Sequence, residues 1–145
     1  MRWSFSGQSA APRVPFWPFR HEVRVEWRDL DAAGHVNNAV YLSYMESARV
    51  AAYFALTGGA RAHDLDIILA RTSIDFRSAA TMGETLVVTV TPGRVGETSF
   101  ALSYVLTDKA TGRVVAEAES VQVCYDYARQ QKKKLAPEMR ARLAP

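Results

Sequence analysis

The 145-residue sequence is poor in the features that mark several protein classes. It has one cysteine, Cys124, which excludes an intrachain disulfide and a cysteine-rich zinc site. It has no uncharged apolar run of the roughly 18 residues that a membrane span needs. The best candidate, residues 38–57, is interrupted by Glu46 and Arg49. A secretory signal is also absent, because Arg13 and several prolines interrupt any apolar core near the start. We therefore expect no membrane span and a cytoplasmic location.

The net charge of +3 is unevenly distributed, and the central segment has no basic excess. Residues 21–128 contain nine basic and fourteen acidic side chains, whereas residues 1–20 and 129–145 are both basic. A nucleic-acid-binding domain needs a basic patch or stripe on its folded body. The charge distribution therefore argues against nucleic acid as a partner.

The composition describes one globular domain with extensions at both ends. Hydrophobic residues make up 48% of the chain and charged residues 23%, which is typical of a folded domain of ordinary size. Residues 1–20 are rich in proline and have no period, so we expect an irregular N-terminal arm in which Phe16, Trp17 and Phe19 pack against the body. Residues 21–128 form the predicted domain. Residues 129–145 form a basic C-terminal extension with a short helix that begins near Pro137.

The first half of the domain predicts a strand, a loop and a long helix. Residues 21–28 alternate, with Val23, Val25 and Trp27 on the face expected to be buried. After the loop, the helix runs from about residue 38 to the glycine pair at 58–59, with an asparagine able to cap its first turn. Because this helix is apolar around most of its circumference, we expect it to be buried nearly all round.

The second half predicts four further strands. The segments are rich in β-branched and aromatic residues and are separated by turn residues; they span residues 67–77, 84–92, 97–107 and 113–126. The short connections favour antiparallel neighbours, since a parallel crossover needs a dozen or more residues. The predicted class is α+β, with an antiparallel sheet wrapped around one helix.

A motif between the first strand and the helix resembles that of a known family. The run DLDAAGHVNNAVYLSYMESAR resembles the signature of the hotdog-fold acyl-CoA thioesterases, in the 4-hydroxybenzoyl-CoA thioesterase-like group. That signature is Asp-x-Asp-x-x-Gly-His-Val-Asn-Asn, followed by an aromatic residue and then by an acidic residue and an arginine on the helix. Every element of that pattern is present: Asp29, Asp31, Gly34, His35, Val36, Asn37, Asn38, Tyr41, Glu46 and Arg49. The order of elements also matches from about residue 20 to 127. One departure is Ala79, where many relatives have proline.

The resemblance implies a fold, an assembly and a reaction. The fold is the hotdog: five or six antiparallel strands around one long central helix. Two subunits pair edge to edge, and often two dimers associate, with the acyl-thioester site at the dimer interface. The reaction is hydrolysis of an acyl-CoA thioester without a metal or cofactor, as part of lipid metabolism.

The resemblance also assigns roles within the loop. Asp31 corresponds to the carboxylate that acts as nucleophile or as general base, and the backbone N–H of Asn38 to the main oxyanion donor. Gly34 allows close approach of the backbone, and Asp29 orders the loop. Four further residues are expected at the substrate: His35, Val36, Asn37 and Tyr41.

Several residues have a second interpretation. Asp31 and the two asparagines could serve only as turn and capping residues. Glu46 could support catalysis, or pair with Arg49 or with a partner subunit. His63, Asp64 and Asp66 have a superficial likeness to a metal site, which their loop setting argues against. Cys124 is expected to be an inert buried side chain. The phosphates of CoA could bind to three basic groups: Arg77, Arg94 and residues 132–134.

Two other functions use the same fold and remain alternatives. A hydratase or dehydratase places its histidine and carboxylate differently and lacks the motif described above. A non-catalytic hotdog domain would bind acyl-CoA without releasing free thiol. A thiol-release assay over several acyl-CoAs distinguishes both from a thioesterase.

Overall fold

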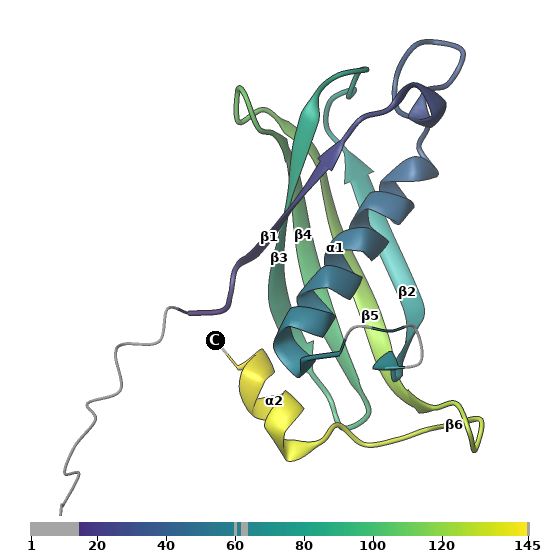
Figure 1. Ribbon diagram of the computed structural model, residues 1–145, viewed down its shortest axis with the longest axis vertical. Helices are drawn as coiled ribbons and strands as arrows, with labels where there is room; N and C mark the ends of the chain where they lie inside the picture. The colour runs from purple at the N-terminus through teal and green to yellow at the C-terminus, as the bar shows by residue number, and fades with distance from the viewer. Residues whose placement is uncertain (1–14, 60, 62–63, 145) are drawn as a thin grey trace, which may run out of the picture.

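The computed structural model describes residues 15–59, 61 and 64–144. It consists of an antiparallel sheet with one long helix across one face and a short helix at the lower end of the sheet (Figure 1). The strands lie in the order β1-β3-β4-β5-β2, with the short β6 paired to β5. The elements are β1 (Phe19–Arg24), η1 (Trp27–Asp29), α1 (Val40–Thr57), β2 (Ile67–Phe76), β3 (Thr85–Val95), β4 (Ser99–Asp108), β5 (Val114–Asp126), β6 (Gln131–Lys132) and α2 (Pro137–Leu143).

The core lies between α1 and the inner face of the sheet. Alternate residues of β3 and β4 point inward and are almost fully buried, among them Leu86, Val88, Leu102 and Leu106. The inward side chains of these strands, which recur at every second residue, pack against the apolar face of α1 in one cluster. The predicted α+β class and antiparallel sheet are confirmed, and the four strands of the second half are all present.

The first strand is shorter than the sequence predicted. It ends at Arg24, and Trp27 lies in the 3₁₀ turn η1 instead of continuing the strand. Val23 and Val25 face inward as expected, but the Trp27 side chain is 77% exposed. The prediction for Trp27 was wrong because the Glu26 and Asp29 side chains cap this turn reciprocally, which breaks the alternation after Val25.

The long helix begins at Val40, two residues later than predicted, and is not buried nearly all round. It packs one face on the sheet, while Leu42, Ser43, Glu46 and Ser47 are exposed. The reason is that a single sheet covers one side of a helix only. The apolar side chain of Leu42 is 46% exposed on this outer side.

The two edges of the sheet differ in character. Edge strand β1 carries outward charges at Arg20, Glu22 and Arg24, which discourage pairing with another chain. Edge strand β2 has ten residues and no partner on its outer side among the described strands. It exposes Ile68, Leu69 and Phe76 by between 42% and 45%. Because β2 also carries exposed charges, at Arg71 and Asp75, the two edges differ mainly in their length and in the apolar side chains that β2 exposes.

The two ends of the described chain meet. The indole N–H of Trp17 donates a hydrogen bond to the carbonyl oxygen of Arg142, at 2.8 Å. Phe16 packs against both neighbouring aromatics, Trp17 and Phe19, and Leu143 of α2 is fully buried. Trp17 and Phe19 thus pack against the core as expected, whereas Phe16 contacts these two rings. The rest of the predicted arm, residues 1–14, lies outside the described residues.

Candidate active site

The motif loop lies at the upper end of the sheet, before α1 (Figure 1). Asp29 organises its first half: one carboxylate oxygen accepts hydrogen bonds from the Tyr44 hydroxyl at 2.7 Å and from the Glu26 N–H at 2.9 Å. The Asp29 carbonyl accepts the N–H of Asn37 at 2.9 Å. Burial, followed by this hydrogen bond, raises the pKa of Tyr44, so its hydroxyl remains a donor at neutral pH. The loop-ordering interpretation of Asp29 agrees with these contacts.

Asp31 uses only one carboxylate oxygen within the loop. Its Oδ1 accepts the N–H groups of Ala33 at 2.9 Å and His35 at 3.3 Å. The turn is closed by Gly34, whose φ of +78° is costly for other residues. Within residues 15–59, 61 and 64–144, Asp31 Oδ2 accepts no hydrogen bond. The turn interpretation and the catalytic interpretation are therefore compatible, since each concerns a different oxygen.

The chain enters α1 through the two asparagines. The Asn37 side chain accepts the N–H of Ala39 at 2.9 Å, and its carbonyl accepts the N–H of Val40 at 2.9 Å. Asn37 therefore stabilises the start of the helix. The N–H of Asn38 has no acceptor in the described part of the chain. Asn38 lies two residues before α1, near the positive end of the helix dipole.

A cavity of about 280 Å³ joins the motif loop to the end of β2. Six residues singled out from the sequence line it, and they are Asp31, His35, Val36, Asn38, Tyr41 and Arg77. Phe76, Ser78 and Ala79 complete the wall. The Tyr41 and Phe76 rings meet edge to face, with centroids 5.2 Å apart, and give the cavity an aromatic side. Burial raises the pKa of Tyr41, so its hydroxyl stays protonated at neutral pH.

Three residues that were predicted to act at the site do not line this cavity within one subunit. Gly34 and Asn37 shape the loop but are not part of the lining. No atom lies within 4 Å of where a Cβ at Gly34 would stand, so lack of space within the chain does not require glycine there. The requirement comes from the positive φ of this residue. Glu46 is 70% exposed, and its carboxylate lies 3.9 Å from the Arg49 guanidinium. This contact matches the predicted pairing with Arg49.

Arg113 is a residue that no sequence pattern singled out. It lies just before β5, and its guanidinium donates to Ser78 Oγ and to the Ala79 carbonyl, both at 2.7 Å. It also contacts both carboxylate oxygens of Glu84, at 2.9 and 3.0 Å. The segment that it holds runs along the cavity and pairs with the motif loop, where the Val36 N–H donates to Ala80. A lone arginine after a turn carries no spacing signal that would have revealed this role.

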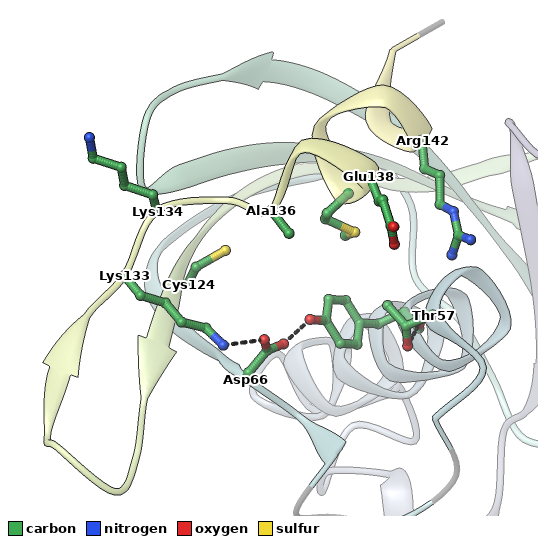
Figure 2. Close-up of a pocket in the computed structure, with 10 residues that line it drawn as sticks. Thr57, Asp66, Cys124, Lys133, Lys134, Ala136, Glu138 and Arg142 are labelled. Carbon is green, nitrogen blue, oxygen red and sulfur yellow. Dashed lines mark hydrogen bonds and ion pairs between the residues drawn. The ribbon is translucent and has the colours of Figure 1, made fainter.

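A second cavity, of about 380 Å³, lies at the opposite end of α1 (Figure 2). Asp66 accepts a hydrogen bond from the Tyr53 hydroxyl and lies 2.6 Å from the Lys133 ammonium. The Lys133 contact and the Tyr53 bond outweigh burial and lower the pKa of Asp66. Cys124 is buried here, which raises the pKa of its thiol to about 11 and agrees with an inert side chain.

The Asp66 carboxylate thus already accepts a hydrogen bond from Tyr53 and pairs with Lys133. Among the described residues, no group of three or more histidine, cysteine, aspartate or glutamate side chains could hold a metal. His63, the third member of the superficial metal-like trio, lies outside the described residues. None of the helices described is both long and apolar enough to cross a bilayer.

Comparison with known proteins shows the family. Residues 25–143 match the profile described as "Thioesterase-like superfamily". The chain belongs to that superfamily. It is 31% identical over 127 residues to the long-chain acyl-CoA thioesterase FadM of Escherichia coli K12, covering 84% of this chain and 94% of that protein.

Solved structures show the same fold in other thioesterase-like proteins. A thioesterase from Thermus thermophilus, complexed with coenzyme A and zinc, is 31% identical with a TM-score of 0.77, over 87% of this chain and 97% of that one. A 1,4-dihydroxy-2-naphthoyl-CoA thioesterase from Synechocystis has a TM-score of 0.76 at 22% identity, over 86% and 94% of the two chains. The predicted hotdog fold and the resemblance to thioesterases are confirmed.

Proposed function

We propose that this member of the thioesterase-like superfamily hydrolyses an acyl-CoA thioester to the free acid and CoA. The observation that carries the proposal is one cavity lined by both Asp31 and Asn38, beside an aromatic wall. Thioester hydrolysis needs a carboxylate at the carbonyl carbon and N–H donors at the oxyanion. The similarity to FadM, named a long-chain acyl-CoA thioesterase, supports the same substrate class.

In the proposed reaction, Asp31 Oδ2 acts at the carbonyl carbon while Oδ1 keeps its loop hydrogen bonds. As a nucleophile it forms a mixed anhydride and releases the CoA thiolate, and water then cleaves the anhydride. As a general base it takes a proton from water, which attacks directly. In both routes the Asn38 N–H, near the positive end of α1, stabilises the oxyanion. The exposed edge of Arg77, which also pairs with Glu117 at 2.9 Å, is available to a substrate phosphate.

The remaining motif residues position the substrate. His35 and Val36 form the cavity floor through their pairing with residues 80 and 81, Asn37 fixes the helix start, and Tyr41 supplies the wall. Glu46 does not line the Asp31 cavity of its own chain. Its carboxylate could therefore support catalysis only at the Asp31 cavity of a partner subunit.

A thiol-release assay tests the function. The purified protein is incubated with acyl-CoAs of graded chain length, and with phenylacetyl- and hydroxybenzoyl-CoA. Release of free CoA from at least one, undiminished by a metal chelator, is expected for a thioesterase that needs no cofactor. Binding without thiol release would indicate the non-catalytic alternative, and addition or loss of water at the acyl chain would indicate a hydratase or dehydratase.

We also propose that two copies pair through β2. A two-fold dimer places identical strands antiparallel. Arg71 and Asp75 face the same, outer side of the sheet, because both are exposed and lie at alternate positions of the strand, on either side of the partly buried Thr72 and Ile74. A two-fold axis at Ser73 sets Arg71 opposite the other copy's Asp75, a favourable pair, whereas an axis at Ile74 sets Arg71 opposite Arg77. The expected axis is therefore at Ser73.

Replacement Ser73→Cys tests this register. At the axis the two introduced thiols lie within the roughly 4.4–6.8 Å Cα separation that a disulfide requires, so mild oxidation is expected to give a covalent dimer in high yield. The measurement is non-reducing electrophoresis. Arg20→Cys, on the opposite edge of the sheet, is the matched control and should stay monomeric on the gel. Equal cross-linking of both variants, or a monomer by light scattering, would contradict pairing through β2.

A dimer of dimers, a cytoplasmic location and a role in lipid metabolism remain predictions from the sequence. Light scattering distinguishes the tetramer from the dimer.

A further inference from the structure

The outer edge of β2 offers backbone groups to a second chain. In an antiparallel ladder, the N–H and C=O groups of successive residues point to alternate sides of the strand. Arg77 donates its N–H to β5, and the Asp66 carbonyl accepts an N–H from β5. The neighbours of these residues, Phe76 and Ile67, therefore point their backbone groups away from β5. The Phe76 N–H and the Ile67 carbonyl thus lie near the two ends of the open edge.

One of these two groups is already bonded. The Tyr127 hydroxyl donates a hydrogen bond to the carbonyl oxygen of Ile67 at 3.0 Å, although the residues are 60 positions apart. Tyr127 follows β5 in the hairpin that leads to β6, at the lower end of the sheet (Figure 1). Its ring meets the Tyr125 ring edge to face, with centroids 5.0 Å apart. A side chain from the hairpin therefore closes the N-terminal end of the β2 edge.

The closed carbonyl is compatible with a two-fold axis at Ser73. β2 has a bulge at residues 69–71, where two residues of the strand oppose one residue of a partner strand. Counting through this bulge, an axis at Ser73 sets Ile67 opposite the other copy's Ser78. The N–H of Ser78 is already donated within its own chain. In this register, the Ile67 carbonyl has no donor to gain from the other copy.

An axis one residue away, at Thr72, would use the same carbonyl. In that register Ile67 lies opposite the other copy's Phe76, whose N–H points to the free edge. Two hydrogen bonds per dimer would then join these residues, one on each side of the axis. Both registers keep the same side chains on the inner face, so the alternation of β2 does not distinguish them. The Arg71–Asp75 pair of the Ser73 register is exposed, and such pairs are weak.

We propose that Tyr127 determines the register in which two copies pair through β2. Its hydroxyl removes the Ile67 carbonyl from the open edge, which withdraws the two hydrogen bonds that would favour the axis at Thr72. Pairing is then confined to residues 71–75, with the axis at Ser73. This inference rests on the β2 pairing proposed above and is independent of the hydrolysis. The device also shortens the edge that is open to chains in a wrong register.

Cysteine cross-linking measures the register, because each axis brings a different residue into disulfide range. Ser73→Cys reports the axis at Ser73, and Thr72→Cys reports the axis at Thr72. Identical residues at the axis lie roughly 4.5–5.5 Å apart between Cα atoms, which a disulfide can bridge. Identical residues one position from the axis are diagonal neighbours at roughly 7–8 Å, which a disulfide cannot bridge. With Tyr127 intact, we expect a covalent dimer from Ser73→Cys and little from Thr72→Cys.

Replacement Tyr127→Phe tests the proposal, because it keeps the ring and removes the hydroxyl. The side chain is 55% exposed, so the core stays intact. The ratio of dimer linked through Thr72→Cys to dimer linked through Ser73→Cys is expected to rise at least about tenfold, the scale of two neutral hydrogen bonds per dimer. Non-reducing electrophoresis after equal times of mild oxidation measures both yields.

Tyr125→Phe is the matched control on the same hairpin. The Tyr125 hydroxyl makes no hydrogen bond within the described part of the chain, so its removal should leave the ratio unchanged. An unchanged ratio in Tyr127→Phe, or an equal change in Tyr125→Phe, would overturn the proposal. Absence of any cross-link through Ser73→Cys with Tyr127 intact would contradict the pairing through β2 itself, and with it this inference.

Discussion

Replacement Asp31→Asn is expected to lower kcat for acyl-CoA hydrolysis at least about 10²-fold, the scale of a missing general base. Asparagine keeps an oxygen that can accept the N–H groups of Ala33 and His35, so the loop retains its hydrogen bonds. What it removes is the charge, and with it the nucleophile or base at Oδ2. Steady-state thiol release by the purified dimer measures the effect.

Asp31→Ala provides the matched comparison, because it removes both the charge and the acceptor. A catalytic Asp31 predicts that both variants lose hydrolysis. A residue that only closes the turn predicts that Asn behaves almost as wild type while Ala is impaired. Near wild-type kcat in a dimeric Asp31→Asn protein would therefore refute the catalytic assignment and leave the turn interpretation.

The second large effect is expected at Arg113. Replacement Arg113→Met removes the cation that pairs with Glu84 and two further hydrogen bonds, to Ser78 and Ala79. Arg113 and Glu84 are 36% and 24% exposed, so solvent screens part of the loss, and we expect the free energy of unfolding to fall by about 2 kcal/mol. Because the freed segment lines the Asp31 cavity, kcat is also expected to fall about tenfold. Urea unfolding and thiol release measure the two effects.

Lys109→Met is the control for Arg113, since it breaks an ion pair to Glu22 whose partners are 57% and 53% exposed. It should cost about 0.5 kcal/mol or less and leave kcat unchanged. Arg113→Lys should recover part of the stability through Glu84 but less of kcat, because one ammonium does not match the guanidinium fork that reaches three groups. Equal kcat in Arg113→Met and wild type would show that Arg113 stabilises the fold without positioning the cavity.

The elements predicted correctly from the sequence are those whose signal is local. The alternation in the later strands, the apolar helix and the motif from Asp29 to Asn38 are each read within about twenty neighbouring residues. The structure places Asp31 and Asn38 on one cavity. The alternation predicted a buried Trp27. The side chain is exposed because a capped turn interrupts the strand pattern there.

Other features depend on residues far apart in the chain and have no periodic signal. Arg113 reaches Ser78, 35 positions earlier, because β5 runs beside β2. The second cavity joins Tyr53 to residues of the C-terminal segment, which only the return of the chain past β6 brings together. The exposure of one side of α1 likewise follows from the number of sheets that cover it, which a helical pattern does not encode.

The contact between Trp17 and Arg142 joins residues 125 positions apart at the two ends of the described chain. Polypeptides whose ends meet in this way tolerate circular permutation, in which a linker closes the ends and a new opening is cut elsewhere. The exposed turn at 109–112, between β4 and β5, is a suitable place for that cut. In the permuted protein β5 would precede the motif loop along the chain, yet still pair with β2 in the same sheet. The order of the strands along the chain could then be changed without changing their spatial order in the sheet.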